Sequence, residues 1–313
     1  MKSIKSDCNG NIITGVTAIL IIATIITGIL LLTTISYITE ENSNSIASDD
    51  FKNIMNSYEN DLNDLLLESI KDLANQVIKS KTPSKNSPND IKEILNQKLD
   101  KKNEEYLEKY GITISSEVYT VENTTHPTYI QSKIKISATK GNETYENVYI
   151  AKASVEGLKD PLPVLKCGKY PSFAYNETTV IYHESLHDFL KDSNVENPEG
   201  YIDAISPFII RVCPYDPYIH HGDSETLKDC IEHGYYHESS DGSCYLCRLE
   251  GKGKCNHYGF EVFIQAGENN ITESLSASDH VVFHDQYPGE RLYFAPGKSI
   301  FLDSSHRLKY GLS

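Results

Sequence analysis

The chain has 313 residues, which at about 100 to 200 residues per domain fits one large or two modest domains. Its formal net charge is -15, from 44 Asp and Glu against 29 Lys and Arg. This negative charge repels phosphate backbones and argues against nucleic acid as a partner. Charged residues at 23% and hydrophobic residues at 39% are near globular averages, which argues against a chain that is mostly disordered or wholly embedded in a membrane.

One long apolar segment lies near the N-terminus. No charged residue occurs between Asp7 and Glu40, a stretch longer than the roughly 20 apolar residues needed to cross a bilayer. It also exceeds the apolar stretch of about 7 to 15 residues in a cleaved signal peptide. Lys2 and Lys5 precede it, so the positive-inside rule places the N-terminus inside and the rest of the chain outside. We therefore predict a cytoplasmic N-terminus over residues 1–10 and a transmembrane helix over 11–38, with the lipid bilayer as partner.

Two amphipathic helices are expected next. From Phe51 to Ile78 the apolar residues recur at steps of three and four, with Ser48 ahead as a cap candidate. Residues 79–90 hold two prolines and interrupt the pattern. A second helix should then run from Ile91 to about Lys109, capped by Asn89 or Asp90. We predict a helical stalk over residues 39–110, with at least one of its helices packed on the sheet that follows.

The apolar period changes to two after Ile112. Alternating segments at 112–121, 129–139 and 144–157, with a turn at Gly141, predict an antiparallel meander. Beyond Pro161 and Pro163 the chain becomes rich in loops, and short strands are expected at Phe208–Val212, Phe260–Gln265, Val281–Phe283 and Ser299–Leu302. The predicted fold class is α+β, with an extracytoplasmic α+β domain over 111–313 whose Cys- and His-rich part covers 167–257.

The cysteines allow either disulfides or a metal site. Six cysteines follow the predicted span, an even number that permits three disulfides among Cys167, Cys213, Cys230, Cys244, Cys247 and Cys255. Alternatively, Cys244-x-x-Cys247 has the spacing that presents two thiolates to one zinc ion, with Cys255 and His257 as further ligands. The single residue between Cys255 and His257 matches no zinc-ribbon template, so disulfides, a structural zinc and free thiols all remain open.

A second constellation is the HESLH string at 183–187. On a helix, this HExxH pattern holds zinc through His183 and His187 and places Glu184 beside the bound water as general base. Glu225, in a Glu-x-x-x-Asp string, is the candidate third ligand. Zinc is thus the candidate cofactor both for the site at Cys244-x-x-Cys247 and for the HESLH site.

The surroundings of HESLH favour a plainer interpretation. Asp188 puts a charge directly after the second histidine, and the helix expected here is short, opening at residues 176–179 and closing at 191–194. Such a helix would bury Leu186 and leave its histidines in solvent.

Two groups of residues carry a resemblance to known proteins. The charged leader, Gly10 and the long apolar helix resemble the entry segment of archaeal type IV pilin-like proteins, in which a prepilin peptidase cuts after the small residue. Four strings resemble uncharacterised single-pass envelope proteins of methanogen-type archaea: CPYDPYIHHG at 213–222, ESSDGSCYLCRLEGKGKC at 238–255, SASDHVVF at 276–283 and DSSHRLKYGL at 303–312. The resemblance implies an extracytoplasmic location and envelope or filament subunits as partners, and it implies no activity.

The function expected from the sequence is that of a single-pass, membrane-anchored extracytoplasmic surface protein with a structural, adhesive or pilin-like role. The alternative is a membrane-anchored zinc metallopeptidase that uses HESLH, with Glu184 as its catalytic residue.

Overall fold

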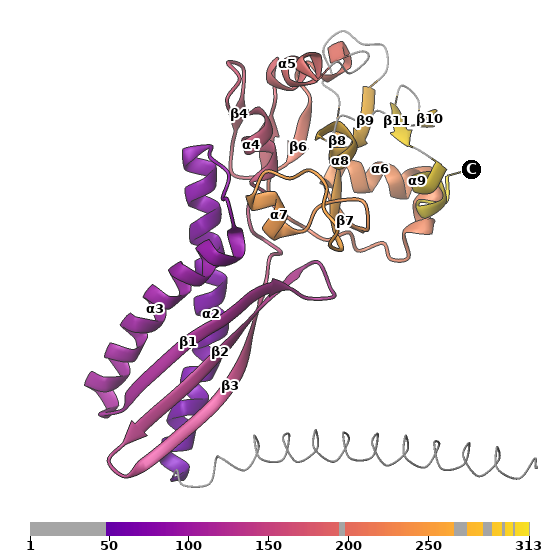
Figure 1. Ribbon diagram of the computed structural model, residues 1–313. Helices are drawn as coiled ribbons and strands as arrows, with labels where there is room; N and C mark the ends of the chain where they lie inside the picture. The colour runs from indigo at the N-terminus through magenta and orange to yellow at the C-terminus, as the bar shows by residue number, and fades with distance from the viewer. Residues whose placement is uncertain are drawn as a thin grey trace, which may run out of the picture.

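The computed structural model describes residues 48–193, 198–265, 274–283, 290–295, 298–302 and 304–312. Figure 1 shows two parts: two long helices beside a three-stranded sheet, and a second part made of short helices and strands beyond one end of that sheet. The predicted transmembrane helix at 11–38 lies outside the described residues. Within the described ranges, no helix combines the length and apolarity needed to cross a bilayer.

The two long helices have well-defined ends. Helix α2 (Asp49–Ser80) begins after Ser48, whose side chain accepts a hydrogen bond from the Phe51 N–H. Helix α3 (Ser87–Tyr110) begins after Asn86 rather than at Asn89 or Asp90. Pro88 explains this difference, because a residue without an N–H costs little in the first turn of a helix, where N–H groups lack intrahelical partners. Gly111 ends α3 with φ at 64°.

The predicted antiparallel meander is confirmed. Strands β1 (Thr113–Asn123), β2 (Tyr129–Lys140) and β3 (Glu143–Ser154) pair in the order β1-β2-β3. Along β2, buried and more exposed residues alternate strictly, so that one face of the sheet is turned inward.

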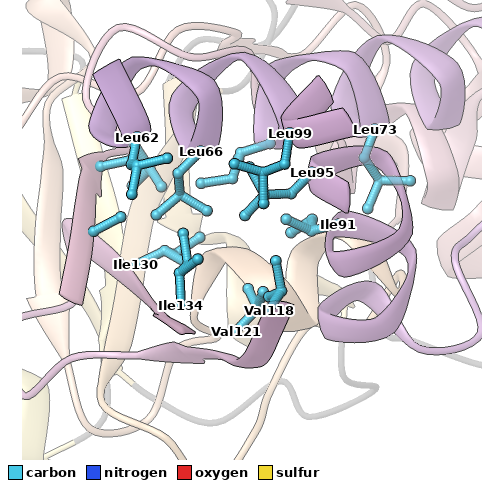
Figure 2. Packing of buried hydrophobic residues seen from close by; sticks show 14 of the residues in the cluster. Leu62, Leu66, Leu73, Ile91, Leu95, Leu99, Val118, Val121, Ile130 and Ile134 are labelled. Carbon is cyan, nitrogen blue, oxygen red and sulfur yellow. The ribbon is translucent and has the colours of Figure 1, made fainter. Parts of the chain in front are cut away.

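Helices α2 and α3 both cover this inner face, α3 against β1 and α2 against β3. Figure 2 shows the labelled apolar side chains meeting between the helices and the strands: Leu62, Leu66, Leu73, Ile91, Leu95, Leu99, Val118, Val121, Ile130 and Ile134. The helices predicted as a stalk are therefore part of a shared hydrophobic core. The same core continues into the second part through Leu249, Phe260 and Val262.

The second part is built on an eight-stranded sheet of mostly antiparallel strands. Its order is β10-β11-β9-β8-β6-β5-β4, and β7 also pairs with β8. The strands are β4 (Ala174–Tyr175), β5 (Thr179–Ile181), β6 (Ile205–Pro207), β7 (Tyr236–Ser239), β8 (Gly259–Gln265), β9 (Ser274–Ser278), β10 (Glu290–Ala295) and β11 (Lys298–Leu302). The helices of this part are short: α4 (Leu162–Cys167), α5 (Ser185–Asp192), α6 (Ser224–His233), α7 (Tyr245–Leu249), α8 (Asp279–Phe283) and α9 (Ser304–Lys309), with 3-10 turns η2 (Pro198–Tyr201) and η3 (Tyr218–Gly222).

Two of the four short predicted strands are correct and two are wrong. The strands expected at Phe260–Gln265 and Ser299–Leu302 are β8 and β11. After β6 ends at Pro207, residues 208–212 form isolated bridges instead of a strand. Val281–Phe283 belongs to helix α8, because three consecutive apolar residues show no period that separates a strand from a buried helix. The α+β class with antiparallel sheets is confirmed.

Candidate metal centres

The HESLH string is not carried on one helix. Helix α5 starts at Ser185, and residues 179–181, where a helix was expected, form strand β5. His183 lies before the helix with φ at 48°, and its Nδ1 is 3.1 Å from Asp203 Oδ1. The predicted helix boundary is therefore wrong, and the two histidines do not occupy successive turns as a zincin site requires.

The other proposed ligands of this site lie elsewhere. His187 Nδ1 is 3.0 Å from its neighbour Asp188, and Glu225 lies in α6, where it faces Lys228 at 3.8 Å. Among the side chains that the structure describes, His183, His187 and Glu225 do not meet in a metal-ligand group. The arrangement that Glu184 would need in order to act as a base on a metal-bound water is not assembled.

Three other groups of ligand side chains do converge, all in the second part. In each, the ligand atoms lie within 4.8 Å of one another. We call them the Cys2His2 group (Cys213, His221, Cys230 and His237), the Cys3His group (Cys244, Cys247, Cys255 and His257) and the Glu-His-His group (Glu261, His280 and His306).

The Cys2His2 group is fully enclosed. Cys213 follows β6, His221 lies in η3, Cys230 in α6 and His237 in β7, and all four side chains are buried. Cys213 Sγ lies 3.3 Å from Cys230 Sγ and 3.5 Å from His221 Nε2. His237 Nε2 lies 2.9 Å from Cys230 Sγ and 3.2 Å from His221 Nε2.

These separations resemble the edges of a zinc tetrahedron. With Zn–S of about 2.3 Å and Zn–N of about 2.0 Å, two sulfurs lie about 3.8 Å apart, a sulfur and a nitrogen about 3.5 Å, and two nitrogens about 3.3 Å. The measured separations equal these values or fall short by up to about 0.6 Å. The four atoms thus surround a space that suits one small cation.

Neighbouring groups orient the two imidazoles. His221 Nδ1 lies 2.8 Å from the Tyr218 carbonyl oxygen, so that this nitrogen donates its proton and Nε2 is left with a lone pair. Burial lowers the pKa of His237, which keeps its ring neutral. The rings of Tyr218, Phe263 and Tyr310 pack around the histidines and keep the site apolar.

The thiols of this group favour deprotonation of one member. The hydrogen bond from Cys230 lowers the pKa of Cys213 well below its usual range, although burial opposes the shift. The same hydrogen bond and burial raise the pKa of Cys230. A thiolate is the form of cysteine that binds a metal. The geometry therefore favours the thiolate of Cys213, and a bound cation would stabilise the thiolate of Cys230.

The Cys3His group lies nearer the surface. Cys244 precedes helix α7 and Cys247 lies within it, so one helical turn presents both thiols to the same point. His257 Nδ1 is 3.6 Å from each of these two sulfurs, and the sulfur of Cys255 accepts a hydrogen bond from the Cys244 N–H at 3.4 Å. Asn123 of strand β1 donates to Cys244 Sγ at 3.2 Å, which ties the group to the first sheet. The structure thus brings together all four ligands that the sequence nominated for a zinc site.

The Glu-His-His group is buried beneath the C-terminal helix. Glu261 lies in β8, His280 in α8 and His306 in α9. Glu261 Oε2 is 2.9 Å from His306 Nε2 and 3.2 Å from His280 Nδ1. Burial alone would raise the pKa of Glu261, but the hydrogen bond from His306 and the charge of Lys309 hold it well below its usual range. The carboxylate is therefore ionised.

A buried arginine connects the Cys3His group to the Glu-His-His group. Arg248, in α7, is fully buried, and its guanidinium contacts Asp160 at 2.6 Å and Asp279 at 2.5 Å. Asp279 also accepts hydrogen bonds from the N–H groups of Val262 and His280. Through these contacts Arg248 fixes the start of α8, where His280 is located.

No disulfide joins any two of the six cysteines in the described part of the chain. All six cysteines after the predicted span are free. The sulfurs of Cys213 and Cys230 lie 3.3 Å apart, compared with about 2.05 Å in a disulfide. Cys167 is buried at the end of α4 and belongs to none of the three groups in the described part of the chain.

Three of the converging side chains, Glu261, His280 and His306, were not considered as ligands from the sequence, and His221 and His237 were noted only as histidines near the cysteines, without an assigned site. Their separations along the chain, such as the 45 positions from Glu261 to His306, match no short ligand spacing. The available signal was the clustering of histidines after residue 125, which permits metal binding without pairing particular residues.

Comparisons with protein-family models, curated proteins and solved structures give no match to the chain. The resemblance to archaeal pilin-like and envelope proteins therefore stays a prediction, and the functional argument rests on the three groups of ligand side chains.

Proposed function

We propose that this chain is a membrane-anchored surface protein whose second part is stabilised by two structural zinc ions, one in the Cys2His2 group and one in the Cys3His group. The observation that carries the proposal is the 3.2 Å approach of His221 Nε2 to His237 Nε2 inside a fully buried site with two thiols.

A hydrogen bond from His237 Nε2 to His221 Nε2 would account for the contact between the two rings, because His221 Nδ1 is engaged with a carbonyl and its Nε2 is an acceptor. It would not explain why both thiols converge on the same two nitrogens. A disulfide between Cys213 and Cys230 would account for the two sulfurs but leave both imidazoles unexplained. Zinc accounts for all four side chains, and two thiolates neutralise its charge, as a buried site requires.

The Cys3His group supports a second zinc ion. Three thiolates and one zinc ion leave one negative charge, which suits the partly exposed position of Cys255 and His257. Lys252 lies in the turn between Cys247 and Cys255; its hydrogen bond to Glu250 is the main cause that raises its pKa, and the nearby thiols add to the shift.

The ligand sets favour a structural over a catalytic role. Four protein ligands close the coordination of zinc, whereas catalytic zinc leaves a position for water. Together the two ions would join η3, α6, α7 and β7, elements too short to bury much apolar surface of their own. A rigid head of this kind suits the structural or adhesive role expected from the sequence. The anchor is the predicted helix at 11–38.

The test is the zinc content of the full-length chain, purified in mild detergent without added metal or chelator. We expect about two tightly bound zinc ions per chain, and the loss of one in Cys230→Ser and of one in Cys247→Ser. Cys167→Ser is the matched control, because it removes a buried free cysteine outside the groups and should leave the zinc content unchanged.

An intact mass under non-reducing conditions separates the rival interpretation. A wild-type chain with no zinc and a mass lowered by two hydrogens per cysteine pair would show disulfides and overturn the proposal.

A further inference from the structure

The Glu-His-His group differs from the two thiolate groups in having three ligands and no sulfur. We infer that Glu261, His280 and His306 bind a third divalent transition-metal ion and leave one coordination position open toward an adjoining cleft. Two imidazoles with one carboxylate form a ligand set that suits zinc or iron(II) and recurs at metal sites that bind water or substrate.

An ion pair alone does not explain the geometry. Glu261 Oε1 already accepts hydrogen bonds from Lys309 Nζ and Tyr310 Oη, each at 2.5 Å. This leaves Oε2 to face both imidazoles. His280 Nδ1 lies 3.2 Å from Oε2 yet is a buried nitrogen without a hydrogen-bond partner. A cation between the three side chains would occupy that nitrogen and share the carboxylate oxygen.

The surroundings hold two of the three ligands in place, as metal sites require. Lys309 and Tyr310 orient the Glu261 carboxylate through its other oxygen. The backbone N–H of His280 donates to Asp279, which pairs with the buried Arg248. The site is therefore formed by neighbours that do not themselves need the metal.

A cleft adjoins this group at His306. A cavity of about 290 Å³ is lined by His306 and Lys309 of the C-terminal segment, with the other walls from Glu238, Ser239, Ser240, Asp241 and Tyr258. His306 thus belongs both to the metal group and to the wall of the cleft. Lys309 pairs with Glu261, Asp241 lies 3.8 Å from Lys254 and Glu238 lies 3.1 Å from His126, so these wall charges favour neither anions nor cations. The open position should take water or a neutral oxygen or nitrogen donor.

Cobalt(II) substitution of the full-length chain tests this inference directly. We expect three cobalt ions per chain, two with thiolate-to-metal charge-transfer bands and one without. Imidazole, a small neutral donor, should shift the ligand-field bands of the third ion and leave the charge-transfer bands unchanged.

Variants assign the third ion to its ligands. Glu261→Gln should lower the affinity for the third ion by at least about 100-fold. Loss of an outer contact to a metal costs up to about that much, and loss of a ligand should cost no less. Glu238→Gln changes the cleft without removing a ligand, and this variant should still bind the third ion. If Glu261→Gln does not fold, the imidazole titration of the wild-type chain still decides whether a third ion with an open coordination position is bound.

Binding of two thiolate-bound ions and no more overturns the third site, and a third ion that ignores imidazole overturns its open position. One ion without charge-transfer bands, and none with them, would support the third site while refuting the two structural zinc ions.

Discussion

Replacing Arg248 by Met tests whether the buried charges hold the second part together. The guanidinium lies between Asp160 and Asp279, and it also donates to the carbonyl oxygens of Ser243 and Phe260 at 3.3 Å. Met has a similar volume and no charge, so the variant keeps most of the packing while leaving two carboxylates unpaired.

The expected cost follows from the burial of these partners. Asp160 is fully buried and Asp279 is 2% exposed. Removing one partner of a buried ion pair costs about 3–5 kcal/mol. At about 2–4 °C per kcal/mol for a domain of this size, the melting temperature should fall by about 6–20 °C. Burial raises the pKa of Asp160 even with Arg248 present. The loss of the guanidinium should raise this pKa further.

The assay is calorimetric melting of wild type and variant at several pH values. A carboxyl group whose pKa is raised by folding contributes stability below its unfolded pKa of about 3.9 and loses it as the pH rises through the folded value. The deficit of the variant should therefore be largest near pH 7 and smaller near pH 4. The control is Lys98→Met, which removes the surface pairs to Glu68 and Asp72 and should cost at most about 1 kcal/mol.

Two results would refute this reasoning. If Arg248→Met melts within about 2 °C of the wild type, the buried pairs contribute little beyond an apolar side chain of the same volume. If its deficit does not depend on pH, unpaired carboxylates are not the cause of the loss.

The remaining predictions address the core, the metals, pH and the anchor. Ile134→Ala should lower the free energy of unfolding by about 2–5 kcal/mol, measured by urea titration, since this side chain is fully buried between helix and sheet. A strong chelator should remove hydrogen-exchange protection from residues 213–265 and leave the protection of 49–154 in place; equal loss in both would contradict separate stabilisation by metal. Glu261 has a folded pKa well below its usual value, so its contribution is present above its unfolded pKa of about 4.3 and is lost as the pH falls; Glu261→Gln should flatten this acid limb of the melting curve. Deleting residues 1–40 should move the protein from the membrane fraction to the soluble fraction, and continued sedimentation with membranes would contradict the predicted anchor.

The sequence was sufficient to predict the first part of the fold. The apolar steps of three and four in α2 and the strict alternation in β2 are local patterns, and a long element repeats its pattern often enough to be read. Capping was predicted less well, because Asn86 and Asn89 are both suitable cap residues and the position of Pro88 in the first turn decides between them.

The second part was less predictable because its elements are short. Val281–Phe283 and the segment before Ser185 have too few residues to show a period, and tertiary contacts determine their conformation. His183 illustrates the result: a residue type that fits a zinc motif is placed in the left-handed region ahead of a helix, with Asp203 beside its ring.

The sequence by itself determined the α+β class, the meander and the nomination of Cys244, Cys247, Cys255 and His257, whose close spacing lets one turn and the following loop gather them. The tertiary structure alone brought together the Cys2His2 and Glu-His-His groups. Their ligands are distant in sequence and come from strands, short helices and 3-10 turns whose mutual positions depend on how those elements pack. Local conformation is encoded by neighbouring residues, whereas convergence of distant side chains exists only once the core has closed around them.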